Sequence, residues 1–192
     1  MALVKAGNIA AIAAPFLNSL AWDASEDFVI CKSPEKLQAL LAKVKHGCCV
    51  HYISDGDWSM HDIVMELIKT YKPADVFITT YALREFPMRQ LILAQDRGDI
   101  NKIFMLLDYR AKARTPEVYH MAAQNVNKIV MTSIHAKVTV INSPLGNITI
   151  VGSANWTQNP RIEAGVITMD NSVAEFHKDW IEKVMNDGEI FE

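Results

Sequence analysis

Several features that would assign the 192-residue chain to a special class of proteins are scarce or absent in its sequence. Only three cysteines occur, two of them adjacent at Cys48 and Cys49, and neither a C-x-x-C nor a zinc-ligand spacing is present. This usage favours a reducing compartment, and we expect a cytoplasmic protein. No apolar run approaches the roughly 20 residues that span a bilayer, so we expect no stable membrane insertion. With 50% hydrophobic and 21% charged residues, the composition excludes disordered and fibrous classes.

Positive charge is also in short supply over the whole chain, but it is unevenly distributed. The 19 Lys and Arg residues face 22 Asp and Glu residues, which argues against a protein held on nucleic acid by charge alone. The segment from Arg84 to Lys137 nevertheless carries 9 basic and 5 acidic residues. A basic middle fits an anionic substrate bound at one face, although solvated helices often carry such runs as well. Both interpretations stay open on the sequence alone.

Helix and strand patterns alternate along most of the chain. Ser33-Pro34 predicts the start of a helix, with Ser as N-cap and Pro at the first helical position. Further helices are expected over residues 59–71, 87–96, 116–124 and 172–185, and strands over residues 28–31, 48–53, 75–81, 103–107, 128–132, 136–141, 147–151 and 164–169. This order predicts an α/β fold in which a mixed β-sheet is flanked by helices on both faces.

The informative motif begins at His135-Ala-Lys137. On a strand, the period of two would place both side chains on one face, about 7 Å apart along the chain. An H-x-K alone is weak evidence, but Gly152-Ser153-Ala154-Asn155 begins 17 residues after His135 and Glu163 follows eight residues after Asn155. The combination is specific.

With these residues the chain resembles the phospholipase D superfamily, in its short form with one H-x-K per chain. The matching pieces are His135, Lys137, the run 152–155 with Trp156-Thr157 after it, and Glu163. The resemblance covers about residues 48–188. We therefore expect a phospholipase D-like domain over residues 46–192, preceded by an N-terminal extension over residues 1–45 whose role is unknown. Its apolar segment Ile9–Leu17 resembles a weak signal-peptide core, but a buried or dimer-packing helix is favoured.

One position departs from the family pattern. The family has Asp seven residues after the His, where this chain has Asn142, and the loop between Asn142 and Gly152 is about three residues longer than usual. That Asp generally supports the site and is not the nucleophile. The change therefore affects the expected activity, but the residues that would carry out the reaction are all present.

The resemblance implies a role for each site residue. His135 would attack phosphorus through one ring nitrogen and form a phosphohistidine, and Glu163 would hold the other ring nitrogen. Lys137 and Asn155, supported by Ser153, would bind the phosphate oxygens as charged and neutral donors. These donors perform the task that a divalent ion has in other enzymes, so we expect neither a metal nor another cofactor.

The mechanism also needs a second histidine, which would protonate the leaving group, and the chain has no second H-x-K. A two-fold homodimer would place His135 of each subunit in one shared site. Tyr81 and Arg84, at a strand end within the basic segment, are candidates to line the substrate groove.

Three functions follow from this pattern. The leading one is a metal-independent phosphodiesterase, a hydrolase of the nuclease type, whose partner is nucleic acid or another phosphodiester substrate. A phosphatidyltransferase is the second enzyme class. The alternative outside the enzymes is a catalytically inactive phospholipase D-like dimer that serves as a binding or structural module, which Asn142 and the acidic overall balance favour.

Overall fold

The computed structural model of the protein describes residues 25–31, 34–56, 58–158 and 161–187. The expected apolar segment Ile9–Leu17 and the expected N-cap Ser33 lie outside the described residues. The strands are β1 (Ser25–Cys31), β2 (Cys48–Asp55), β3 (Ala74–Thr80), β4 (Ile100–Asp108), β5 (Lys128–Thr132), β6 (Val138–Ser143), β7 (Gly146–Gly152) and β8 (Ile162–Met169). The helices are α2 (Pro34–Leu41), α3 (Met60–Thr70), α4 (Glu85–Asp96), α5 (Tyr109–Arg114), α6 (Pro116–Asn125) and α7 (Asn171–Asp187).

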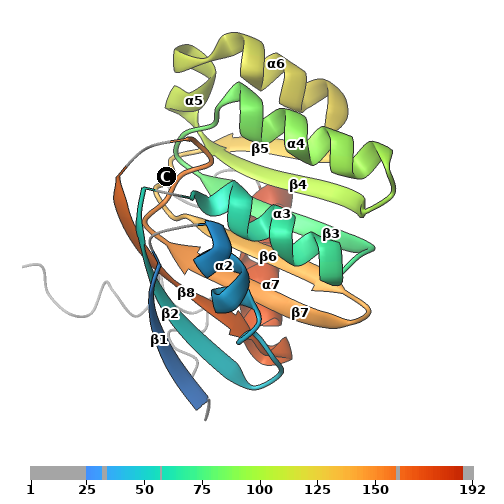
Figure 1. Ribbon diagram of the computed structural model, residues 1–192. Helices are drawn as coiled ribbons and strands as arrows, with labels where there is room; N and C mark the ends of the chain where they lie inside the picture. The colour runs from blue at the N-terminus through green and yellow to red at the C-terminus, as the bar shows by residue number, and fades with distance from the viewer. Residues whose placement is uncertain (1–24, 32–33, 57, 159–160, 188–192) are drawn as a thin grey trace, which may run out of the picture.

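The eight described strands form one mixed sheet in the order β1-β2-β8-β7-β6-β3-β4-β5 (Figure 1). Strands β3, β4 and β5 are parallel, as are β1 and β2 at the other edge. The strands between them, β2-β8-β7-β6-β3, pair antiparallel. The short hairpin between β6 and β7 and the helical crossovers elsewhere explain this division, because parallel neighbours need long connections. The mixed sheet expected from the sequence is confirmed.

Helices cover both faces of the sheet, as expected. Helices α2, α3, α4 and α6 lie on one face, where residues such as Leu40, Ile63 and Leu91 form the larger apolar core (Figure 1). Of the helices in the described part of the chain, α7 alone covers the other face, where Ile181 packs in a smaller core with Phe77 and Val140. Among the described residues, no helix is long and apolar enough to cross a membrane.

Local sequence signals set the helix boundaries. Helix α3 begins after Ser59, where a capping box joins the Ser59 and Asp62 side chains to each other's backbone N–H groups. Helix α4 is followed by Gly98 at a φ of 74°, a left-handed conformation that favours glycine. Pro116 occupies the first turn of α6, where its missing N–H costs nothing.

The sequence predicted that the H-x-K segment lies on a strand. In the structure it does not, because β6 begins only at Val138. The hydroxyl of Thr79 on β3 explains the difference. It accepts a hydrogen bond from Val138 N at 2.9 Å and donates one to Ala136 O at 3.0 Å. At this point the Thr79 hydroxyl makes the hydrogen bonds that a backbone group of β3 would make in a regular sheet. Residues 133–137 therefore lie beside the sheet without forming a strand.

The described part of the N-terminal region belongs to the same sheet and core as the rest. Strand β1 pairs along its whole length with β2, and Leu37 and Leu40 of α2 pack in the larger core. The structural unit therefore begins at or before Ser25, ahead of the boundary expected between residues 45 and 46.

Candidate active site

The motif residues meet at one end of the sheet, where β3 and β7 end and β6 and β8 begin. Gly152 N donates to Lys137 O at 3.1 Å, and Ser153 N donates to Ala164 O at 2.9 Å. These bonds hold the H-x-K segment, the 152–155 loop and the start of β8 side by side. Sequence segments up to 28 residues apart are thereby brought to one place, as the motif spacing predicted.

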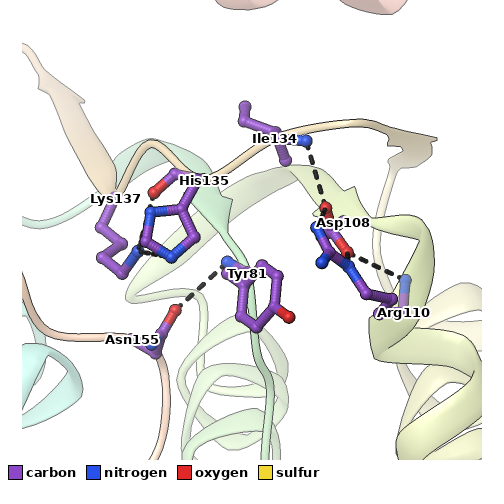
Figure 2. Close-up of polar contacts among 7 residues, drawn as sticks. All are labelled: Tyr81, Asp108, Arg110, Ile134, His135, Lys137 and Asn155. Atoms are coloured by element: carbon purple, nitrogen blue, oxygen red, sulfur yellow. Dashed lines mark hydrogen bonds and ion pairs between the residues drawn. The ribbon is translucent and has the colours of Figure 1, made fainter.

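His135 and Lys137 form the centre of the site (Figure 2). The His135 imidazole is exposed, whereas the Lys137 side chain is only 7% exposed. Lys137 Nζ donates to His135 O at 2.7 Å and lies 3.4 Å from each nitrogen of the His135 ring. Residues in the spacing H-x-K thus remain in contact without the regular strand that was expected.

Asn155 is held by the end of β3. Its Oδ1 accepts hydrogen bonds from Thr80 Oγ1 and from Tyr81 N, both at 3.2 Å. Trp156 N donates to the same Thr80 hydroxyl at 3.3 Å, and the buried Trp156 ring anchors the loop in the core. Because the oxygen of Asn155 is occupied, its NH₂ group remains the donor for a ligand.

Glu163 and Ser153 form a second pair. The Ser153 hydroxyl donates to Glu163 Oε2 and accepts a hydrogen bond from Ala164 N at 3.1 Å. No hydrogen bond joins Glu163 to His135 within the described chain, so the structure does not show the contact that the resemblance implied. Glu163 is oriented instead by its hydrogen bond with the Ser153 hydroxyl.

The electrostatics of Lys137 depend on this carboxylate. Burial lowers the pKa of the Lys137 ammonium, and the charge of Glu163 partly offsets that effect. The lysine pairs with no carboxylate among the described residues, so its charge is left for a ligand.

Tyr52 on β2 completes this corner of the site, and sequence reasoning missed it. Its register partner is Gly165, and a Cβ at Gly165 would lie 2.5 Å from Tyr52 Oη. A Cβ at Gly152 would lie 3.0 Å from the same atom. The tyrosine therefore lies across two glycine positions, and its buried hydroxyl has no hydrogen-bond partner among the residues that the structure describes. Burial, reinforced by the charge of Glu163, raises the pKa of Tyr52.

Asp108 holds the chain just before the motif. Its carboxylate accepts a hydrogen bond from Ile134 N at 3.3 Å and is bound by Arg110 Nε at 2.7 Å (Figure 2). The Arg110 guanidinium holds the pKa of the Asp108 carboxyl below its usual value. Asp108 is the last residue of β4, the strand next to β3. It therefore orients the segment that precedes His135.

Tyr81, an expected groove residue, lies between His135 with Lys137 on one side and two arginines on the other. Its ring meets the His135 ring edge-on, with centroids 5.0 Å apart. The guanidinium carbons of Arg110 and Arg114 lie 4.6 and 4.9 Å from the Tyr81 ring centroid, within cation–π range. Lys137 Nζ lies 6.0 Å from the same centroid.

Arg84 and Asn142 are the two other positions singled out in the sequence. Arg84 is exposed and lines a pocket next to Asn155. Asn142 lies near the far end of β6, where it pairs with Asp75 of β3 and Asn147 of β7. No group of three or more His, Cys, Asp or Glu residues forms a candidate metal site in the part of the chain that the structure describes.

This fold, with an H-x-K segment facing an Asn and a Glu from the following loop and strand, defines a phospholipase D-like domain. A family described as "Cardiolipin synthase, PLD-like domain" matches residues 23–185. The chain belongs to this family.

Solved structures resemble the chain in fold. Polyphosphate kinase from Porphyromonas gingivalis aligns with a TM-score of 0.52 and 15% identity, over 81% of this chain and 28% of the kinase. An archaeal chromatin protein, TrmBL2, aligns with a TM-score of 0.48 and 13% identity, over 81% of this chain and 60% of that protein. The chain therefore spans less than a third of the kinase's length. No curated protein shows a significant match to the chain.

Proposed function

We propose that the protein is a metal-independent phosphodiesterase that cleaves nucleic acid through a phosphohistidine, in a site shared across a homodimer. The observation that carries the proposal is the exposed imidazole of His135 beside the buried ammonium of Lys137, which pairs with no carboxylate among the described residues. Burying a charge without a partner is costly, and an anion bound at the site removes that cost. Phosphodiester chemistry is what the family match supports in general.

The first chemical step transfers the phosphoryl group to the protein. A ring nitrogen of His135 forms a bond to phosphorus, and the bond from phosphorus to the leaving oxygen breaks. Lys137 and the NH₂ group of Asn155 bind the non-bridging oxygens, whose charge grows in the transition state. The leaving oxygen takes a proton from His135 of the partner subunit.

The second step restores the enzyme. The partner subunit's His135, now neutral, takes a proton from water, and the water oxygen attacks phosphorus. The phosphorus–nitrogen bond breaks, and the product phosphate leaves. Glu163, oriented by Ser153, supplies a negative charge near the Lys137 ammonium at this corner of the site.

Nucleic acid is the substrate class that the surroundings of the site favour. An aromatic ring contacted by two guanidinium groups, as at Tyr81, is the combination of stacking surface and positive charge that binding of single strands uses. The name of the matching family favours phosphatidyl transfer as the second candidate. An inactive binding module is the third possible result.

A side-by-side assay separates these candidates. Wild type and His135→Ala are incubated with single-stranded DNA, RNA and phosphatidylglycerol vesicles, each with and without EDTA. We expect nucleic-acid cleavage by wild type that resists EDTA and falls at least about 10³-fold in His135→Ala. Lipid turnover alone would establish the transferase, and equal inertness of both proteins would establish the inactive module.

The shared site is tested by mixing. Light scattering should give about twice the 21.5 kDa chain mass. Excess His135→Ala protein exchanged into wild-type dimers should reduce the activity per wild-type chain, because each mixed site lacks one of its two histidines. A fully active monomer, or activity unaffected by the variant, would contradict the shared site.

A further inference from the structure

A pocket opens next to Asn155, and the proposed mechanism uses none of its other lining residues. Its volume is about 190 Å³, and three segments form its walls. These are the start of the β3–α4 connection, the end of α5 with Thr115, and the loop after Asn155. The residues that line this arginine pocket are Ala82, Leu83, Arg84, Ala111, Arg114, Thr115, Asn155, Thr157 and Gln158.

The charge of the arginine pocket is positive and uncompensated. Arg84 and Arg114 are both exposed, and the lining contains no carboxylate. Neither arginine pairs with a carboxylate among the described residues. Arg110, one helical turn away from Arg114, differs because its guanidinium is bound to buried Asp108. Two guanidinium groups without a carboxylate partner among the described residues, with the hydroxyl group of Thr157 in the same lining, form a typical set of donors for a phosphate.

Hydrogen bonds between the walls fix the shape of the pocket. Arg84 N donates to Trp156 O at 3.0 Å, which joins the β3–α4 connection to the loop after Asn155. The Thr115 hydroxyl lies 3.4 Å from Leu83 O, and Thr115 N donates to Ala111 O at 3.0 Å. The pocket is therefore formed before a ligand binds, so a ligand meets donors that are already positioned.

The arginine pocket adjoins the position of the scissile phosphate. Asn155 belongs to both places, since it lines the pocket and its Oδ1 accepts a hydrogen bond from the N–H of Tyr81, whose ring meets that of His135 (Figure 2). Arg114 and Lys137 lie 4.9 and 6.0 Å from the same Tyr81 ring centroid. A substrate bound at Lys137 that carries a second phosphate next to the first would place it within reach of Arg114.

We propose that the arginine pocket binds the phosphate that neighbours the scissile one on a nucleic-acid strand. This inference rests on the proposed nuclease function and assigns a subsite to it. A strand repeats its phosphates at each nucleotide, so a cleaved bond inside the strand always has such a neighbour. The mainly polar lining suits a phosphate and offers no continuous apolar surface for an acyl chain.

Short thymidine substrates test this subsite directly. The dinucleotide TpT has one phosphodiester and no neighbouring phosphate, whereas pTpT and TpTp each add one terminal phosphate. For wild type we expect kcat/KM to rise at least about tenfold for one of the two extended substrates over TpT. In Arg114→Ala that gain should fall below about threefold, and Arg114→Lys should retain part of it because the charge remains without the planar fork.

Lys112→Ala is the matched control. Lys112 lies on the same helix and its removal changes the net charge equally, but its ammonium lies 5.0 Å from the Tyr119 ring centroid and does not line the pocket. This variant should keep the full gain, and thermal melting should show that all three variants are folded.

Each other outcome overturns a defined part of the account. No gain in wild type, an equal gain in Arg114→Ala, or an equal loss in Lys112→Ala would contradict the subsite while leaving the nuclease intact. Stronger inhibition by phosphatidylglycerol vesicles than by pTpT, lost in Arg114→Ala, would assign the pocket to a lipid headgroup. Absence of cleavage of all three dinucleotides and of bis(p-nitrophenyl) phosphate would overturn the proposed function, and the subsite with it.

Discussion

Polar side chains are paired differently at the two ends of the central sheet, the end that carries His135 and the far end, where β3 and β4 begin. At the far end, Asp99 is bound by Lys72 and Arg97 at 2.9 Å each, and Asn147 Nδ2 donates to Asn171 Oδ1 at 3.2 Å. At the catalytic end, Lys137 and Arg114 have no carboxylate partner, and the Tyr52 hydroxyl has no hydrogen bond, within the described residues. At the far end these charges are paired, whereas at the other end Lys137 and Arg114 stay without a carboxylate partner beside the Arg110–Asp108 ion pair.

The difference indicates which end is built for a ligand. Unpaired buried polar groups reduce stability, so a fold retains them where a ligand completes them. Strand β6 runs from one end of the sheet to the other, with Lys137 just before it and Asn142 near its last residue. Substitutions at the two ends of the sheet can therefore be compared directly.

Among the changes that compare the two ends of the sheet, Asn155→Ala should have the largest effect. In the proposed mechanism the amide binds a non-bridging oxygen, and loss of such a donor lowers kcat by about 10²–10³-fold in comparable sites. Asn147→Ala removes the same side chain at the far end, where its partner is Asn171, and should leave kcat within about twofold. Steady-state kinetics of both variants on one oligonucleotide decide the point. Equal effects of the two changes would remove the distinction between the ends.

Gly165→Ala should destabilise the fold. The new Cβ would lie 2.5 Å from Tyr52 Oη and 2.7 Å from Val151 O, and such overpacking costs about 1–3 kcal/mol. Gly152→Ala should cost less, because its nearest contacts are 3.0 and 3.1 Å. Urea denaturation at constant m measures both. An unchanged midpoint in Gly165→Ala would show that Tyr52 is not held across the two glycines.

The pH dependence of cleavage should report Lys137. Its pKa is lowered by burial, so the active charged form is lost as pH rises, at a pH below the usual value of about 10.4 for lysine. In Lys137→Arg the side chain stays charged, so this alkaline decline should disappear even though the rate at neutral pH falls about tenfold through altered geometry. A pH profile of kcat for both proteins provides the comparison, and an identical alkaline decline would exclude Lys137 as its source.

The smallest effect is expected for Asn142→Asp at the far end. The new carboxylate would face Asp75 across the β3–β6 pair, and like charges directly opposite cost about 0.2–1 kcal/mol. This loss should shrink in 1 M salt, where charges are screened within about 3 Å. Turnover should change less than twofold, since the position lies away from the site. A tenfold gain in turnover would show instead that the family's Asp acts on the catalytic centre.

Most of the fold was predictable because its signals are local. Strand β5 has the bounds that its apolar run predicted, and α3, α6 and β2 differ from expectation by one or two residues. Helix α5 was missed because its six residues are too short to show a periodic apolar face. The start of β6 was misplaced because a side chain from another strand, Thr79, sets it.

The site was predictable only in part. His135, Lys137, Asn155 and Glu163 are recognisable because they share one segment with fixed spacing. Tyr52, Asp108 and Arg114 come from other elements, and only the strand order β2-β8-β7-β6-β3-β4 brings them to the same end of the sheet. Glycines at 152 and 165 were a possible signal for Tyr52, but their pairing across β7 and β8 is visible only in the fold.

The central claim is that His135 forms a covalent bond to phosphorus, and trapping that bond tests it most directly. A strand labelled at the scissile phosphate is mixed with protein, quenched in alkali and separated under denaturing conditions. The account predicts label on wild-type protein that survives alkali, is released by acid and maps to His135, with none on His135→Ala. Cleavage by wild type without any protein-bound label, or equal labelling of His135→Ala, would contradict it.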